Sequence, residues 1–219
     1  MNIAIDGPAG AGKSSIAKLL AKDMGFIYVD TGAMFRAMAY YFLSGGIDTH
    51  DEGAVSRECG KIRIRIEYRD GVQHIYLNDI DVSDDIRKEE VGKNASVIAP
   101  YPVVRTKLLE LQRAMAAEND VIMDGRDIGT VVLPDAEAKI FLTAGSRVRA
   151  ERRFRELQEK GETCDLDQIE ADIIARDKQD MSREIAPLKQ AEDAVLVDTS
   201  YMTIPEVVAA IREIAEAKR

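Results

Sequence analysis

Residues 2–14 read NIAIDGPAGAGKS. The first five of them are mainly apolar and run directly into glycines, which is typical of a buried parallel strand that ends in a tight turn. After Lys13, apolar residues such as Ile16 and Leu20 recur at helical spacing. Residues 7–14 match the pattern G-x-x-x-x-G-K-[ST], in which flexible glycines present backbone N–H groups at the start of a helix. The alternative is a glycine-rich turn that only precedes a helix. A buried strand before the motif and an amphipathic helix after it are the context of a phosphate-binding loop, so we favour that function.

A nucleoside triphosphate with a metal ion is the ligand that this pattern predicts. The lysine reaches the β- and γ-phosphates, and the serine after it can ligate Mg²⁺. Asp124 ends another apolar stretch and is a second candidate for the metal, although any buried strand that ends in aspartate looks the same. No guanine-reading N/T-K-x-D motif occurs, which disfavours a GTPase. We therefore expect Mg²⁺ at Ser14 and ATP bound by Gly7, Pro8, Ala9, Gly10, Ala11, Gly12, Lys13, Ser14 and Ser15.

The composition of the 219 residues is that of an ordinary soluble globular chain, with 46% hydrophobic and 32% charged residues. The net charge of -9 argues against binding to nucleic acid or to a membrane surface. No apolar run approaches the ~18 residues of a transmembrane helix, and the N-terminus lacks the segments of a secretion signal. Cys59 and Cys164 lack metal-ligand spacing, so we expect free thiols in a cytoplasmic protein.

Strands alternate with helices along most of the chain. Helices are expected at residues 34–43, which Gly45-Gly46 terminates, and at residues 102–118, and a capping box at Thr203 opens the last one. Short apolar runs predict core strands at residues 2–6, 26–30, 121–124, 138–142 and 194–198. This order predicts an α/β fold with a five-stranded parallel sheet flanked by helices.

Residues 61–82 follow a different pattern. Ile62 and Ile64 alternate with charged residues, which is typical of a half-exposed antiparallel strand. Asp70-Gly71 predicts a hairpin turn, and the apolar residues from Ile75 to Val82 indicate two further strands. We therefore predict a single domain over residues 1–219. Its parts are a core of residues 1–60, 95–145 and 194–219, a small antiparallel β-insert at about 61–94 and a helical lid at about 146–185.

Two polar segments follow core strands at their carboxyl ends, where ligands of open α/β sheets bind. Residues 30–36 read DTGAMFR and end in Arg36, whose planar fork suits a phosphate. Residues 124–130 read DGRDIGT and place Arg126 beside Asp127. A carboxylate accepts a hydrogen bond from the amine of cytosine but not from the carbonyl of uracil. The alternatives are a helix N-cap with a solvated arginine in the first segment and an internal salt bridge in the second.

Arginines are concentrated in the charged helical stretch from Ser146 to Met181. A helix of this kind is often only a solvated face. Arginines also neutralise a transferring phosphoryl group, and a mobile helical pair that carries them could close and exclude water. The candidates are Arg147, Arg149, Arg152, Arg153 and Arg155, followed by Arg176 and Arg183.

Four segments of the chain together resemble one known family. They are GPAGAGKSS at residues 7–15, DTGAMFR at 30–36, DGRDIGTVV at 124–132 and ARDKQDMSR at 175–183. This combination is similar to that of the bacterial-type cytidylate kinases, which are P-loop nucleoside monophosphate kinases. The resemblance implies an enzyme that transfers the γ-phosphoryl group of ATP to CMP or dCMP, and we expect this enzyme to be a monomer. The products would be ADP and CDP or dCDP, formed by direct in-line, Mg²⁺-dependent transfer.

The resemblance also implies roles for individual residues. The positions that bind the acceptor in the family match Thr31, Arg36 and Arg126 for the phosphate, Ser96, Arg105 and Asp127 for the cytosine, and Arg176 and Asp180, with Arg183 nearby, for the sugar. The expected catalytic residues are Lys13, Arg126 and Arg183. The alternatives are a kinase for another small acceptor and a nucleotide-dependent switch that binds a protein partner.

Overall fold

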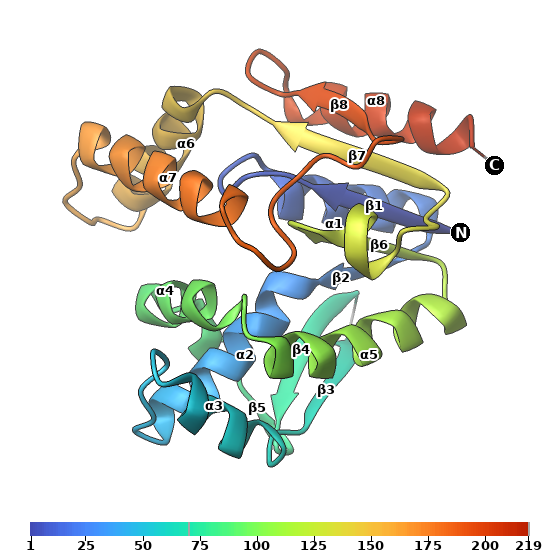
Figure 1. Cartoon of the computed structure of the whole chain (residues 1–219). Helices are drawn as coiled ribbons and strands as arrows, with labels where there is room; N and C mark the ends of the chain where they lie inside the picture. The colour runs from blue at the N-terminus through green and yellow to red at the C-terminus, as the bar shows by residue number, and fades with distance from the viewer. Residues whose placement is uncertain (70, 219) are drawn as a thin grey trace. The chain divides into compact units, whose positions relative to one another are not determined.

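The structure is a computed structural model that describes residues 1–69 and 71–218 (Figure 1). The chain forms two compact units. The first unit consists of residues 1–27 and 119–219, and the second consists of residues 28–118. We describe each unit separately, because the candidate residues divide between them.

A five-stranded parallel sheet lies at the centre of the fold, in the order β2-β6-β1-β7-β8. Its strands are β1 (Asn2–Asp6), β2 (Ile27–Asp30), β6 (Val121–Gly125), β7 (Ala138–Thr143) and β8 (Val195–Asp198). Strand β1 pairs in parallel with β6 and with β7, so Asp6 lies opposite both Gly125 and Phe141. This register brings the residues that follow β1 and β6 to the same edge of the sheet. The α/β fold predicted from the sequence is confirmed.

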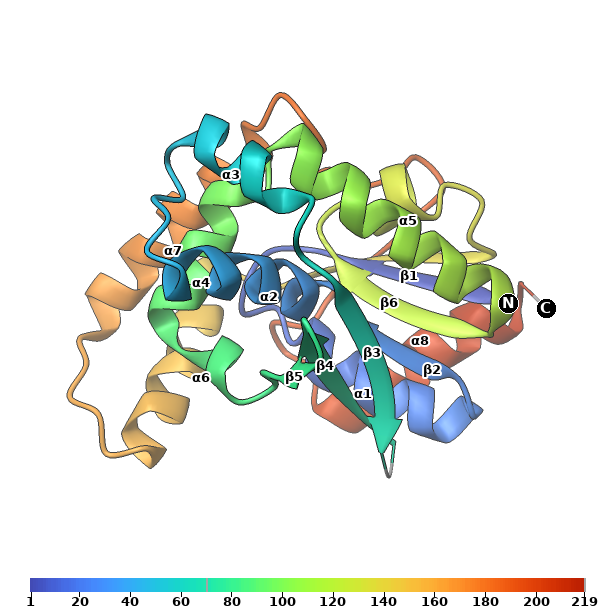
Figure 2. The same ribbon diagram turned by 90° about the horizontal axis from the view of Figure 1, so that it is seen from below.

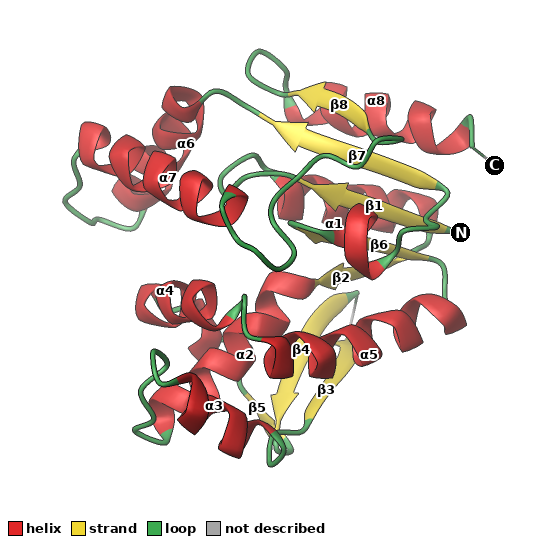
Figure 3. Ribbon diagram, viewed as in Figure 1, coloured by secondary structure: helices red, strands yellow, loops and turns green. Residues whose placement is uncertain are grey.

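Helices of the first unit cover the sheet and extend from it. Helices α1 (Lys13–Met24) and α8 (Ile204–Glu216) pack on each other and on β1, β6 and β7 (Figure 3). Helix α8 begins at the capping box that Thr203 and Glu206 form, as the sequence predicted. Helices α6 (Ser146–Glu159) and α7 (Leu166–Met181) pack as an antiparallel hairpin. A π-helical turn, η2 (Ile128–Val132), follows β6.

The second unit combines helices with a small antiparallel sheet, β3-β4-β5 (Figure 2). The strands are β3 (Ile64–Arg69), β4 (Val72–Leu77) and β5 (Ile80–Asp81), and β3 pairs with β4 from Ile64–Leu77 to Arg69–Val72. The helices are α2 (Thr31–Ser44), α3 (Glu52–Cys59), the 3-10 turn η1 (Asp85–Arg87), α4 (Glu89–Ile98) and α5 (Pro102–Glu118). The predicted antiparallel insert is therefore confirmed. Its predicted turn includes Asp70, which lies outside the described residues.

Helix α2 begins earlier than predicted, at Thr31 instead of about Met34. The reason is an N-cap: the side chain of Asp30 accepts a hydrogen bond from the backbone N–H of Ala33 at 2.8 Å. The cap is worth about 1 kcal/mol and starts the helix directly after β2. Asp30 is therefore the helix N-cap that the sequence analysis gave as the alternative to a phosphate-binding role for residues 30–36.

Two helices, α3 and α4, were not predicted. Both are short, and α3 follows an aspartate cap, Asp51, in a polar stretch without an obvious apolar stripe. In α4 the buried residues Val91, Ala95 and Ile98 do follow helical spacing. No helix in the described residues is long and apolar enough to cross a membrane. Cys59 and Cys164 are both free thiols.

Gly7 marks the point where β1 turns into the phosphate loop, with a φ angle of 148°. A Cβ atom at Gly7 would overlap the backbone carbonyl oxygen of Leu142 in β7. Gly25, which ends α1, also has a positive φ angle, 72°, but a Cβ there would meet nothing within 4 Å.

We expect Gly25→Ala to cost about 1–2 kcal/mol of unfolding free energy, the cost of left-handed strain. We expect Gly7→Ala to cost at least ~3 kcal/mol, because backbone must also move.

Urea denaturation of the two variants measures this difference. Gly25→Ala is the matched control, because it carries the strain without the overlap. Equal losses in the two variants would contradict the close packing of the loop on β7.

Candidate active site

The phosphate loop joins β1 to α1, and its glycines adopt conformations that other residues rarely take. Gly10 and Gly12 have φ angles of 76° and 90°. Lys13 is buried, with 6% of its surface exposed, and its Nζ donates a hydrogen bond to the carbonyl oxygen of Pro8 at 2.8 Å. Ser15, also expected at the nucleotide, is exposed on the first turn of α1. The loop therefore folds around its own lysine, and it joins a buried strand to a helix as the sequence predicted.

The charge on Lys13 is sensitive to its surroundings. Burial, together with the positive charge of Arg126, lowers the pKa of Lys13 to about 7, while Asp124 and Asp6 oppose the shift. Phosphate oxygens close to Nζ would favour the charged form for the same reason that the aspartates do. This electrostatic setting suits a lysine that binds an anion.

Ser14 and Asp124 place two side-chain oxygens beside the loop. The hydroxyl of Ser14 donates to Oδ2 of Asp124 at 2.8 Å, and Asp124 is 5% exposed. Mg²⁺ prefers oxygen ligands and typically takes only one or two from the protein, together with water and phosphate oxygens. Among residues 1–69 and 71–218, no cluster of three or more His, Cys, Asp or Glu side chains could hold a metal. The Ser14–Asp124 pair therefore fits Mg²⁺ that arrives with a nucleotide.

Asp6, the last residue of β1, was not singled out from the sequence. Its carboxylate accepts hydrogen bonds from the backbone N–H groups of Ile128 at 2.8 Å and Gly129 at 2.7 Å. The side chain is 4% exposed, and burial raises its pKa to about 6 against the lowering effect of these bonds. Asp6 thus fixes η2, the turn that follows Arg126 and Asp127. An aspartate at the end of a buried strand was the only signal for it in the sequence.

Arg126, Asp180 and Arg183 form a cluster around the buried carboxylate of Asp180. Asp180 is 2% exposed, and its two carboxylate oxygens bind Nε of Arg126 at 2.9 Å and a terminal nitrogen of Arg183 at 2.6 Å. The predicted alternative of an internal salt bridge after β6 is therefore real. Its acidic partner is Asp180 on α7, and the neighbouring Asp127 is buried at the start of η2. The fold has joined two segments that are far apart in the sequence.

The second unit contains the other candidates for the acceptor phosphate. Thr31 is buried at the first turn of α2, and Arg36 lies one turn further along the same helix. A terminal nitrogen of Arg36 binds Oδ2 of Asp30 at 3.1 Å, and the arginine side chain remains 30% exposed. Asp30, which caps the helix, therefore also holds Arg36. The sequence alternative of a fully solvated arginine does not describe this side chain.

The candidates for the cytosine divide between two helices of the same unit and η2 of the first unit. Arg105 on α5 donates to the carbonyl oxygen of Ala99 at 3.2 Å, and its guanidinium lies 5.9 Å from the ring centroid of Phe35 on α2. Ser96 lies on α4, which packs against α2, and its hydroxyl donates to the carbonyl oxygen of Gly92 at 3.4 Å. Ser96 and Arg105 had no signal in the sequence apart from the resemblance.

Three of the five arginines of α6 contact other parts of the first unit, whereas Arg153 and Arg155 bind residues of their own helix, as expected for a solvated face. Arg147 pairs with Asp167 and Glu170 of α7, and Arg152 donates to Thr199 after β8. Arg149 is 5% exposed and reaches the phosphate loop. Arg153 pairs with Glu156, Arg155 bonds to the carbonyl oxygen of Glu151, and Arg176 lies exposed on α7.

The pKa of Asp6 predicts a pH effect on stability. In the unfolded chain Asp6 loses its proton near its ordinary pKa of 3.8, whereas the folded protein holds the proton to about pH 6. The stabilising contribution of protonated Asp6 is therefore complete below pH 4 and is lost as the pH rises to 6. Asp6→Asn removes this dependence. We expect the unfolding free energy of the wild type, relative to Asp6→Asn, to fall by roughly 3 kcal/mol between pH 4 and pH 7.

Urea denaturation of both proteins over this range measures the change, and the subtraction removes the titration of other groups. Parallel curves for the two proteins would show that Asp6 titrates normally.

Comparison with known proteins agrees with this geometry. The family model described as "Cytidylate kinase" matches residues 3–217. The cytidylate kinase of Lactobacillus johnsonii is 51% identical over 219 residues, which cover 100% of this chain and 95% of that protein. The cytidylate kinase of Carboxydothermus hydrogenoformans is 48% identical over 218 residues, with coverages of 100% and 98%. A solved structure, an uncharacterized protein from Eubacterium ventriosum, shares the fold with a TM-score of 0.54 at 11% identity, over 99% of each chain. The chain therefore belongs to the cytidylate kinase family.

Proposed function

We propose that this protein transfers the γ-phosphoryl group of ATP to CMP or dCMP, giving ADP and CDP or dCDP. The observation that carries the proposal is the arrangement at the ends of β1 and β6. There the phosphate loop with its buried Lys13 starts beside the segment that supplies Arg126, and the charge of Arg126 acts on Lys13. Membership of the cytidylate kinase family over nearly the whole chain selects the acceptor.

ATP is the proposed donor, with its phosphates bound by residues 7–15. The backbone N–H groups at the start of α1 and the Nζ of Lys13 would neutralise the β- and γ-phosphates. Ser14, supported by Asp124 at 2.8 Å, would hold Mg²⁺. Bound there, Mg²⁺ supplies positive charge to the phosphate oxygens.

The acceptor phosphate is the proposed ligand of Thr31, Arg36 and Arg126, and the cytosine that of Ser96, Arg105 and Asp127. The buried carboxylate of Asp127 would accept a hydrogen bond from the cytosine amine. Arg176 and Asp180, with Arg183, are the proposed contacts of the sugar. Each oxygen of Asp180 already binds one arginine, but a carboxylate oxygen can accept a second hydrogen bond.

The transfer itself needs positioning and charge more than acid–base chemistry. A phosphate monoester has a second pKa near ~6, so the acceptor is largely a dianion at neutral pH and needs no general base. Lys13, Arg126 and Arg183 are the proposed catalytic residues, because they can hold donor and acceptor oxygens in line and stabilise the charge of the transition state. The α6–α7 hairpin is the proposed lid, and closing it would exclude water. We propose a cytoplasmic, monomeric enzyme that acts on small molecules. The net charge of -9 supports this choice of partners, because it disfavours nucleic acid and membranes.

An acceptor panel tests the proposal directly. We expect Mg·ATP to phosphorylate CMP and dCMP strongly, UMP weakly and AMP negligibly, because a carboxylate selects the cytosine amine. Chromatography of the products with each acceptor measures this. Preferential turnover of another acceptor would support the alternative of a kinase with a different substrate. Slow ATP hydrolysis that ignores every acceptor would support a switch.

The reading of the base by Asp127 makes a second prediction. In Asp127→Asn, one carboxylate oxygen becomes an NH2 group, which can donate a hydrogen bond to the uracil carbonyl. The side chain also loses its negative charge and one acceptor oxygen, which weakens its hydrogen bond from the cytosine amine. We expect the ratio of kcat/KM for CMP to that for UMP to fall by roughly tenfold. Asp135→Asn, an exposed residue of the same unit, is the control and should keep the wild-type ratio. An unchanged ratio in Asp127→Asn would remove Asp127 from base recognition.

A further inference from the structure

Arg149 of α6 connects three parts of the first unit. Its terminal nitrogens donate to the carbonyl oxygen of Ala9 in the phosphate loop at 3.0 Å and to Oδ2 of Asp177 on α7 at 2.6 Å. Its Nε donates to the carbonyl oxygen of Ala144 at 2.9 Å. We propose that Arg149, held by Asp177, is a positioning residue that fixes the Ala9–Gly10 peptide of the phosphate loop. The proposal deepens the proposed kinase function and rests on it.

The geometry of the peptide bond explains what Arg149 controls. The described residues contain no cis peptide bond, and in a trans peptide the C=O and N–H groups point in opposite directions. By holding the carbonyl of Ala9, Arg149 therefore sets the direction of the N–H of Gly10. Lys13 does the same for the preceding peptide, because its Nζ holds the carbonyl of Pro8 at 2.8 Å. Two buried basic side chains thus fix the orientation of two consecutive peptides of the loop, and with them the directions of the N–H groups of Ala9 and Gly10.

The packing around Arg149 leaves little freedom for this contact. The side chain is 5% exposed, and a Cβ atom at Gly10 would lie only 3.3 Å from the Cβ of Arg149. A lysine at this position could not reach Ala9, Ala144 and Asp177 together, because its single ammonium group lacks the planar fork. Asp177 of α7 binds Arg149 of α6, and Asp180, one turn further along α7, binds Arg126. Helix α7 therefore holds both arginines.

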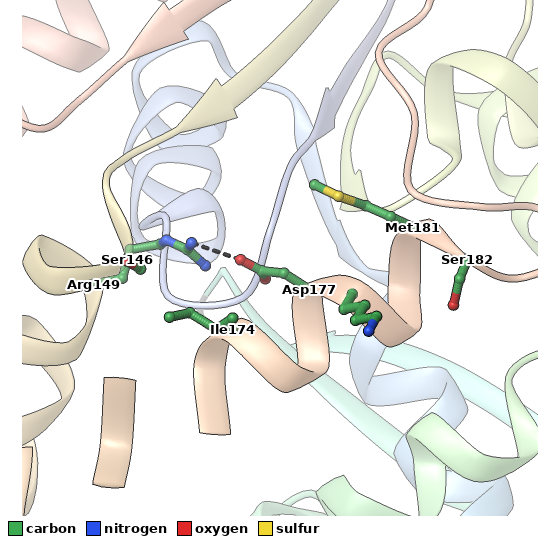
Figure 4. A pocket seen from close by; sticks show the side chains of 7 residues that line it. Ser146, Arg149, Ile174, Asp177, Met181 and Ser182 are labelled. Carbon is green, nitrogen blue, oxygen red and sulfur yellow. Dashed lines mark hydrogen bonds and ion pairs between the residues drawn. The ribbon is translucent and has the colours of Figure 1, made fainter. Parts of the chain in front are cut away.

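A pocket of about 570 Å³ gives access to this ion pair from solvent. Arg149 and Asp177 lie in its wall together with Ile174 and Met181, and Figure 4 shows the two charged side chains pointing toward each other. Truncation of Arg149 would leave space beside Asp177 that a small planar cation can enter. This opening makes chemical rescue by guanidinium a suitable test.

The first experiment measures the affinity for ADP by calorimetry without any acceptor. We expect Arg149→Lys and Arg149→Ala to bind ADP roughly tenfold more weakly, the effect of a lost charge-assisted hydrogen bond. Asp177→Asn should show a smaller loss, and the KM for CMP should stay within about twofold in Arg149→Lys. The control is Asp193→Asn, which breaks a similar pair, with Lys139 at 2.7 Å, at the start of β7. It should leave the affinity for ADP unchanged.

Two further measurements separate positioning from a purely structural role. The effect of Asp177→Asn should vanish in an Arg149→Ala background, because Asp177 acts through Arg149. Millimolar guanidinium, compared with equal NaCl, should raise the kcat/KM for ATP of Arg149→Ala several-fold. Wild-type ADP affinity in the Arg149 variants, an additive effect of Asp177→Asn or the absence of rescue would each overturn the proposal. If CMP is no acceptor, the proposed function fails, but the ADP affinities still decide the role of Arg149.

Discussion

A loop can bind phosphate only if its N–H groups, and not its carbonyl oxygens, point toward the anion. In this chain we propose that buried basic side chains beside the loop fix the orientation of its peptides. Lys13 binds the carbonyl of Pro8 at 2.8 Å, and Gly7 packs so closely on β7 that a methyl group would not fit. These contacts lie entirely within the protein and fix the shape of the loop, so less binding energy is needed to order it.

The same sheet edge sets the position of the groups around the loop. Because β1 lies between β6 and β7, the residues after these strands are neighbours although they are far apart in the sequence. Asp6 fixes the turn after β6, and Asp124 at the end of β6 binds Ser14 at the start of α1. Asp180 on α7 binds both Arg126 and Arg183. Each acidic side chain fixes a group that is proposed to bind or to position a phosphate.

Much of the fold and the donor site could be predicted because their signals are local. Apolar runs identify the core strands, and the phosphate loop is a contiguous motif. The start of α2 was misplaced because the cap at Asp30 outweighs the weaker helical signal further along. Asp6 and Asp177 were missed because their importance depends on contacts with Ile128, Gly129 and Arg149, which no local pattern contains. For the same reason Ser96, Arg105 and Asp180 could be named only through the family resemblance.

The central claim is that the phosphoryl group passes from the nucleotide on the phosphate loop to a cytidylate. The most direct measurement is to incubate the protein with Mg²⁺, CMP and ATP labelled in its γ-phosphate, and to follow where the label goes. The account predicts that the label appears in CDP in a one-to-one ratio with ADP, and that little inorganic phosphate forms when CMP is left out. Label that accumulates in inorganic phosphate at the same rate with and without CMP would contradict it.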